Sequence, residues 1–190
     1  MAKKKDEDSG IVGRFKQGDA FVFEEIVLRY QDRIYNVCRS ILDDQHDAED
    51  AAQEVFLKAF QSLGKFKPDA ALYTWLYRIA VNTCLDFKKS PFSRLLKRLF
   101  DDEEGLKELP SQNPSPERTY TSKQMGARLN AALGKLPYKL RIAIVLKELE
   151  GLSYEEIALI LDISTGTVKS RISRARERLQ KSLKNFREQI

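Results

Sequence analysis

Apolar residues recur at every third or fourth position along most of this 190-residue chain. No run of alternating apolar and polar residues is long enough to indicate a sheet. In the C-terminal part, Val168, Ile172, Ala175 and Leu179 are spaced four, three and four residues apart. This spacing places the four side chains on one face of a helix. We therefore predict an all-α fold.

Breaks in the pattern divide the chain into two small helical domains, residues 10–89 and 122–187, joined by a flexible linker over 90–121. The linker contains four of the six prolines, an acidic stretch from Asp101 to Glu108, and little apolar periodicity. This composition is typical of a connecting segment with at most one short helical turn.

Capping residues predict where the helices begin and end. Asp19 is expected to cap the helix over 19–42, and Gly64 is expected to end the helix over 47–63. Pro137 suits the first turn of the helix over 137–151. The predicted helices cover about 10–17, 19–42, 47–63, 70–89, 122–133 and 137–151.

The last part of the chain has the pattern of a helix-turn-helix. Ser153 and Glu156 form a capping box before a helix from Tyr154 to Leu161. A short turn follows, and Ser164 or Thr165 can cap the next helix. The apolar stripe of that helix faces the core, whereas Lys169, Ser170, Ser173 and Arg174 point away from it and Thr167, Arg171 and Arg178 lie along its edges. A basic outer face on the second helix is what a reader of the DNA major groove requires.

The net charge of +5 hides a strong segregation of charge. Residues 164–190 hold eight basic and two acidic residues, and residues 65–98 hold the same numbers. Residues 43–54 hold six acidic residues and no Lys or Arg. Charge runs are commonly only solvated faces, yet two basic blocks fit a protein that contacts nucleic acid twice.

The stretch from Tyr73 to Thr83 interleaves three large aromatic residues with Arg78 and Asn82. Aromatic rings beside cations can stack unpaired bases. Trp75, Ile79 and Asn82 lie near one helical face, which favours a place in the core for the aromatic rings over base stacking. The residues alone leave both interpretations open.

Several classes of protein are excluded. One histidine, His46, and no phosphate-binding loop argue against an enzyme, a metal centre or a cofactor. Cys38 and Cys84 are expected to be reduced thiols between packed helices. The longest apolar run, Ile142 to Leu146, is too short to insert in a membrane, and Asp6 follows the N-terminal lysines where a signal peptide would be apolar. We expect a cytoplasmic protein.

Three segments together resemble one family. They are the acidic run from Asp47 to Phe56, the aromatic stretch from Tyr73 to Thr83, and the residues from Gly151 to Arg171. They are similar, in the same order, to the extracytoplasmic-function (ECF) group of bacterial RNA polymerase sigma factors, and the aromatic stretch is especially similar to the sigma-E type. The resemblance implies a promoter-melting helical domain, a helix-turn-helix domain, and no domain between them.

The resemblance also implies roles for individual residues. Core RNA polymerase would be bound through its β′ coiled-coil and its β subunit, promoter DNA would be the second partner, and an anti-sigma factor a third. The residues expected to bind the β′ coiled-coil are Asp47, Asp50, Gln53 and Glu54. Those expected at the minus-ten element are Tyr73, Trp75, Arg78, Asn82, Asp86, Lys88 and Lys89. Those expected at the minus-thirty-five element are Thr167, Lys169, Ser170, Arg171, Ser173, Arg174 and Arg178, with the edge residues Thr167, Arg171 and Arg178 on phosphates.

Two other functions remain as alternatives. An ordinary helix-turn-helix regulator would use the first domain for dimerisation or sensing, but such a domain needs neither the acidic run nor the aromatic stretch. An enzyme that modifies nucleic acid would need a catalytic constellation that the chain does not offer. Because the family's two promoter elements are far apart, we also predict that the polymerase positions the domains, which are compact or mutually variable without it.

Overall fold

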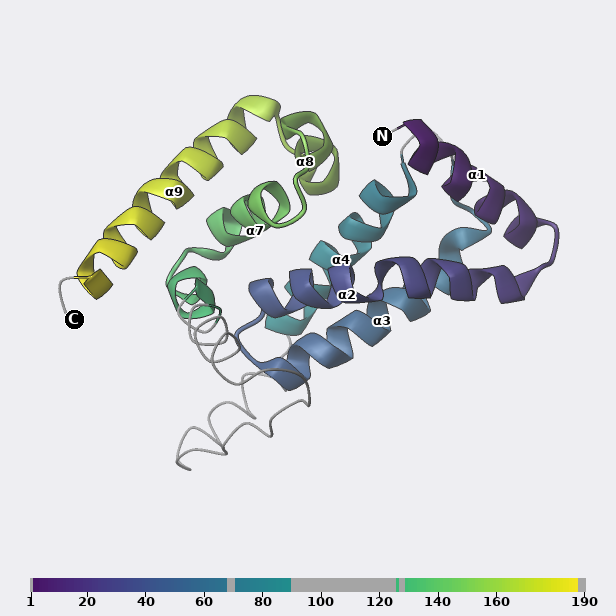
Figure 1. The fold of residues 1–190 in the computed structure, drawn as a ribbon, viewed down its shortest axis with the longest axis horizontal. Coiled ribbons are helices and arrows are strands. Elements are labelled where there is room, and N and C mark those ends of the chain that lie inside the picture. Colours follow the sequence, from purple (N-terminus) through teal and green to yellow (C-terminus); the bar gives the residue numbers. More distant parts are fainter. Residues whose placement is uncertain (1, 68–70, 90–125, 127–128, 188–190) are drawn as a thin grey trace, which may run out of the picture.

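The computed structural model describes residues 2–67, 71–89, 126 and 129–187, and every regular element in these ranges is helical (Figure 1). The elements are α1 (Ala2–Lys16), the short 3-10 helix η1 (Ala20–Val22), α2 (Phe23–Ile41), α3 (Gln45–Leu63), α4 (Leu72–Lys89), α7 (Tyr138–Glu148), α8 (Tyr154–Leu161) and α9 (Thr165–Arg187). Residues 129–134 are helical as well. The predicted all-α fold is confirmed. The predicted linker, 90–121, lies outside the described residues.

The N-terminal group of helices packs around a core shared by α2, α3 and α4. Its fully buried side chains include Ile34, Val37, Val55, Ala59 and Leu76. Cys38 and Cys84 are also buried there as free thiols, which confirms the prediction for both. Each buried Ile, Val or Leu side chain contributes about 1.5–3 kcal/mol through its removal from water.

Helix α1 is attached to α2 by apolar and polar contacts. Ile11 and Val12 are buried. The buried carboxylate of Asp8 accepts a hydrogen bond from the hydroxyl of Tyr30 and another from the guanidinium of Arg29, both 2.8 Å long. A buried carboxylate needs such donors to remain charged.

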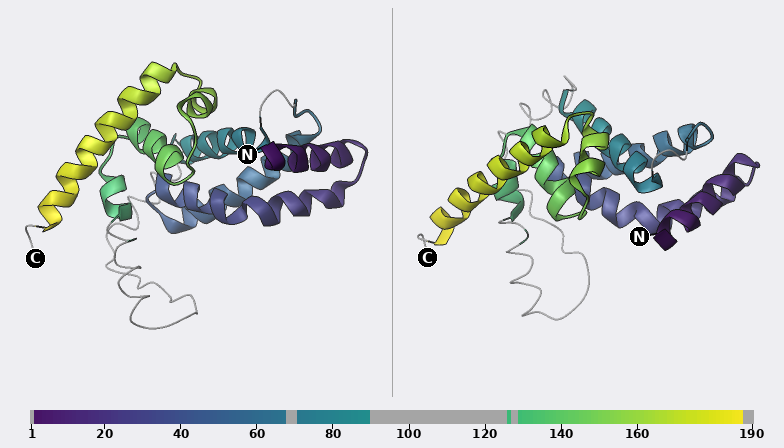
Figure 2. Two further views of the ribbon diagram at one scale, coloured as in Figure 1. Left: turned by 45° about the horizontal axis from the view of Figure 1, so that its top comes forward. Right: turned by 90° about the horizontal axis from the view of Figure 1, so that it is seen from above.

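The C-terminal group consists of α7, α8 and α9, and it packs directly on the N-terminal group. Helix α8 lies against α4 and α7 lies against α2, so that the two groups share one continuous hydrophobic core. Helix α9 extends away from the N-terminal helices (Figure 2). The helix-turn-helix is therefore held beside α4.

Three predicted helix boundaries were wrong. Helix α1 begins at Ala2 rather than near residue 10. Asp19 does not cap α2, because its carboxylate accepts two hydrogen bonds from Arg14 and η1 precedes the helix. Helix α3 begins before Asp47, because the side chain of Asp44 accepts a hydrogen bond from the Asp47 N–H and so caps it.

The sixth predicted helix also ends earlier than expected. Helix α7 stops at Glu148, and Gly151 adopts a φ of +67° in the turn before α8. A residue with a side chain is strained at this φ, so glycine suits the turn.

Candidate nucleic-acid interface

The helix-turn-helix forms as its local sequence predicts. The Ser153 hydroxyl accepts a hydrogen bond from the Glu156 N–H (3.1 Å), and the Glu156 carboxylate accepts one from the Ser153 N–H (2.7 Å). This capping box starts α8. Asp162 takes the left-handed conformation after α8, and the Ser164 hydroxyl accepts from the Thr167 N–H (3.2 Å) at the start of α9. The turn therefore orients α9 through contacts close in sequence.

Helix α9 has one buried face and one exposed face, as predicted. Val168, Ile172 and Ala175 are fully buried. The expected minus-thirty-five residues are distributed over the remaining surface, with Lys169, Ser170, Ser173, Arg174 and Arg178 exposed and Thr167 and Arg171 half-buried. Ser170 already donates its hydroxyl to the Thr167 carbonyl (2.9 Å).

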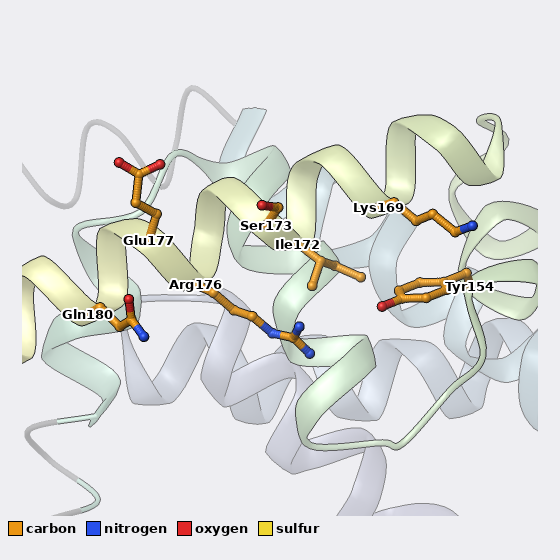
Figure 3. Close-up of a pocket in the computed structure, with 7 residues that line it drawn as sticks. All are labelled: Tyr154, Lys169, Ile172, Ser173, Arg176, Glu177 and Gln180. Atoms are coloured by element: carbon orange, nitrogen blue, oxygen red, sulfur yellow. The ribbon is translucent and has the colours of Figure 1, made fainter.

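Two further side chains that the sequence did not indicate shape this face. The Tyr154 ring lies 4.9 Å from the ammonium of Lys147 and 5.7 Å from that of Lys169. Arg176 binds the carboxylate of Glu148 at 2.6 Å and so ties α9 to α7. Figure 3 shows Tyr154, Lys169 and Arg176 around the same shallow pocket. Arg176 is thus engaged within the C-terminal group.

The acidic patch lies on α3. Asp50 and Gln53 are exposed, and Glu54 and Asp47 are half-buried. Glu54 lies 3.5 Å from Lys58, one turn further along. Positions 50, 53 and 54 share one side of the helix. The structure therefore presents the predicted acidic face on the outside of the N-terminal group.

A cavity of about 330 Å³ opens beside α4. Trp75 is half-buried and packs against Phe66, with ring centroids 5.2 Å apart. The lining residues are Ser62, Lys65, Phe66, Lys67, Trp75, Arg78 and Leu159. The sequence indicated Trp75 and Arg78, and Lys65 and Lys67 belong to the predicted basic block. Aromatic rings beside three cations suit an unpaired nucleic-acid strand.

The remaining minus-ten candidates follow α4 toward its end. Asn82, Asp86, Lys88 and Lys89 are all exposed. Tyr73, Arg78 and Lys88 bind other parts of the same chain. Tyr73 donates a hydrogen bond to Glu156, Arg78 donates one to the Leu159 carbonyl (2.8 Å), and Lys88 donates one to Asp43 (3.2 Å). These contacts could not be predicted from the sequence pattern.

In the described ranges, no group of His, Cys, Asp or Glu side chains could hold a metal ion. Nor does that part of the chain contain a helix with the length and apolar character needed to cross a membrane.

Comparisons with known proteins match both halves of the chain. A family model described as Sigma-70 region 2 matches residues 26–90, and one described as Sigma-70, region 4 matches residues 126–179. The RNA polymerase sigma-H factor of Pseudomonas aeruginosa is 39% identical over 186 residues, which is 94% of each chain. The ECF RNA polymerase sigma-E factor of Escherichia coli K12 is 39% identical over 178 residues, which is 90% of this chain and 91% of that protein.

Two solved structures have a similar fold. CnrH, in complex with the cytosolic domain of CnrY, aligns with a TM-score of 0.69 at 27% identity over 94% of this chain and 97% of its own. The sigma factor RpoE of Bartonella quintana, in complex with the anti-sigma factor NepR, aligns with a TM-score of 0.64 at 29% identity over 85% of this chain and 96% of its own. With these relatives and both sigma-70 regions in the expected order, the chain belongs to the ECF group of RNA polymerase sigma factors.

Proposed function

We propose that this chain is an alternative sigma subunit of bacterial RNA polymerase. It binds core enzyme, recognises a promoter with minus-ten and minus-thirty-five elements, and promotes the start of transcription. It catalyses no reaction itself, because nucleotide addition belongs to the core enzyme. The observation that carries this proposal is the presence in one chain of three separate surfaces: the acidic face of α3, the aromatic and basic cavity beside α4, and the exposed face of α9.

Each surface has its own task in the proposal. The acidic face, Asp47, Asp50, Gln53 and Glu54, binds the basic β′ coiled-coil. The α4 face captures the opened strand of the minus-ten element. The Asn82 amide donates a hydrogen bond to an exposed base edge and accepts one from it. Residues 90–121 join the two DNA-binding domains, 10–89 and 122–187. The α9 face reads the minus-thirty-five element in the major groove.

The domains must separate for this task. Two elements some 25 base pairs apart are about 85 Å apart at roughly 3.4 Å per base pair. In the structure, however, Tyr73 of α4 is hydrogen-bonded to Glu156 of α8. One molecule in this arrangement cannot reach both elements. We therefore propose that core polymerase holds the domains apart.

The same family relationship supports two further statements. Relatives with this fold were solved with the cytosolic domain of CnrY and with the anti-sigma factor NepR, so we propose that an anti-sigma factor binds this chain too. We also propose that it acts in the cytoplasm, where the polymerase transcribes.

Reconstitution with core RNA polymerase tests the proposal. The chain should co-purify with core enzyme and direct run-off transcription from a sigma-E-type promoter that core enzyme alone does not use. An ordinary regulator would bind duplex DNA without core enzyme and would start no transcription. Failure to bind core enzyme, with normal duplex binding, would therefore favour the regulator and refute the proposal.

A further inference from the structure

The turn between α7 and α8 places two carboxylates on the α4 face. Tyr73 and Tyr77 are one helical turn apart on α4, and each donates its hydroxyl hydrogen bond to a glutamate of the C-terminal group. Tyr77 binds Glu150, and Tyr73 binds Glu156. The two glutamates flank the Gly151 turn, so a single short segment, residues 150–156, makes both contacts.

Glu150 is the buried centre of this contact. Its side chain is only 4% exposed, and its carboxylate lies 2.7 Å from the guanidinium of Arg33 in α2. Arg33 also donates a second hydrogen bond through Nε, at 2.8 Å. A buried carboxylate with a guanidinium and a hydroxyl as donors is well compensated, whereas one without them is costly. Residues 150–156 are therefore held against α2 and α4 by an ion pair and hydrogen bonds as well as by packing.

The protonation states suit this pairing at neutral pH. Burial, together with the hydrogen bond to Glu156, raises the pKa of Tyr73 to about 12. Burial alone would raise the pKa of Glu156, but the hydrogen bonds from Tyr73 and Ser153 outweigh it and lower that pKa. Tyr73 thus remains a donor and Glu156 a charged acceptor.

Segment 150–156, together with Leu159 further along α8, covers groups that the proposed function assigns to DNA contacts. Tyr73 and Arg78 are proposed to contact the minus-ten strand, and here they bind Glu156 and the Leu159 carbonyl. Leu159 also lines the cavity that contains Trp75. A DNA strand would bring phosphate oxygens, which are anionic acceptors like the glutamate carboxylates. The same donors cannot serve both at once.

We propose that the α4 face is a docking surface for the chain's own acidic segment 150–156, which excludes the DNA strand until the domains separate. This inference rests on the proposed function, since it takes α4 to be the strand-binding helix. If about nine molecules in ten are closed, the apparent affinity of the free protein for single-stranded DNA falls about tenfold. Core polymerase removes this loss by holding the domains apart.

The test opens the contact at Glu150. Glu150→Lys places a cation against Arg33, which should repel the segment from α4. Glu155→Lys is the matched control, because Glu155 is exposed in the same segment and the change in net charge is identical. The probe is a fluorescein-labelled single strand of about 15 nucleotides, measured by anisotropy on the full chain. Small-angle scattering on the same samples gives the radius of gyration.

We expect Glu150→Lys to bind the strand roughly tenfold more tightly than Glu155→Lys and to have the larger radius of gyration. Equal affinity and equal radius for the two variants would overturn the inference. If circular dichroism shows that Glu150→Lys does not fold, Glu150→Gln against Glu155→Gln decides by the same criteria, with a smaller expected difference.

A transcription assay separates this inference from the proposed function. With saturating core polymerase, both variants should support transcription like the unmodified chain, because the segment is already displaced. If none of the three proteins supports transcription, the proposed function fails, while the scattering result still decides whether segment 150–156 closes the molecule. If all three support it and the free variants do not differ, only the docking inference fails.

Discussion

The guanidinium of Arg141 in α7 lies 2.7 Å from the carboxylate of Asp43, which follows α2. The Arg141 side chain is only 3% exposed, and it also donates hydrogen bonds to the carbonyls of Ile41 (2.8 Å) and Gly134. Lys88 at the end of α4 lies 3.2 Å from the other Asp43 oxygen. One buried cation thus links the C-terminal group to the loop between α2 and α3, away from the Glu150 contact.

Replacing this cation should destabilise the protein. Arg141→Met removes the shorter of the ion pairs that link Asp43 to Arg141 and Lys88, and it takes a donor away from the carbonyls of Ile41 and Gly134. This should lower the free energy of unfolding by about 2–3 kcal/mol. Urea denaturation measures this loss. The control is Arg176→Met, because the Arg176 pair with Glu148 is about half-exposed and should matter little. An equal loss of unfolding free energy in both variants would mean that Arg141 contributes no more to stability than an exposed ion pair does.

Lowering the pH should weaken the ion pair between Arg141 and Asp43. Burial alone would raise the pKa of Asp43, but Arg141 and Lys88 outweigh it and bring the pKa below its ordinary value of 3.8. The stabilisation from a lowered carboxylate pKa is complete above the ordinary value and is lost as the pH falls through the folded value. Scattering between neutral pH and about pH 3 should show the radius of gyration rising at the acid end.

Asp43→Asn tests whether this carboxylate is responsible. The variant should already have the larger radius at neutral pH and should change less on acidification. If the variant and the unmodified chain expanded with the same pH dependence, another acidic group, such as Glu156, would be the cause.

The acidic face of α3 should determine binding to core polymerase. Asp50→Lys combined with Glu54→Lys should weaken core binding at least about tenfold, because each reversal turns an attraction to a basic partner into a repulsion. Surface plasmon resonance with core enzyme measures this. Two reversals elsewhere, Glu24→Lys with Asp32→Lys on exposed positions of α2, control for net charge. Similar affinities for both double variants would remove the role assigned to α3.

Local features of the fold could be predicted from the sequence because their partners are near neighbours in the chain. Ser153 and Glu156 are three residues apart, and the capping box forms as predicted. The buried stripe of α9 follows from helical periodicity in the same way. Asp19 shows the limit of such reasoning, because Arg14 competes for the carboxylate that would otherwise cap α2.

The contacts between the two groups of helices could not be predicted in this way. Tyr73 and Glu156 are 83 residues apart, and Glu156 already has a local role in the capping box with Ser153. Nothing in the spacing of either residue indicates the other. The sequence pattern predicted which residues lie on α4 but not the segment that covers them, because that depends on how distant parts of the chain pack together.

Arg174 and Arg178 on α9 should affect DNA binding differently, because one is assigned to a base and the other to a phosphate. Arg174 is on the outer face, where a bidentate contact to guanine contributes about 1–3 kcal/mol of discrimination. Arg178 is assigned to phosphate, so Arg178→Ala should weaken binding to all sequences alike and reduce the salt slope by about one. Arg174→Ala should instead relax the preference at one or two base pairs. Competition binding of holoenzyme to specific and scrambled minus-thirty-five elements checks both, and an equal loss on the two DNAs for Arg174→Ala would show that it reads no base.

The last prediction concerns strand opening on α4. Asn82 is exposed and has the hydrogen-bonding groups that an extruded base needs. Holoenzyme with Asn82→Ala should still bind duplex promoter through the minus-thirty-five element, but it should form fewer open complexes. Permanganate footprinting measures this through the reactivity of unpaired thymines. Normal thymine reactivity in the Asn82→Ala variant would mean that this side chain does not capture the base.

Trp75 separates capture of the strand from support of the fold. Stacking of one base on an aromatic ring contributes about 1–3 kcal/mol, comparable to the cost of unstacking it in a duplex, so α4 cannot hold a duplex open without the polymerase. Trp75 also packs against Phe66. If its main role is capture, promoter DNA with a mismatched bubble should partly rescue Trp75→Ala. If its role is only packing, the variant should melt at lower temperature and the bubble should restore nothing.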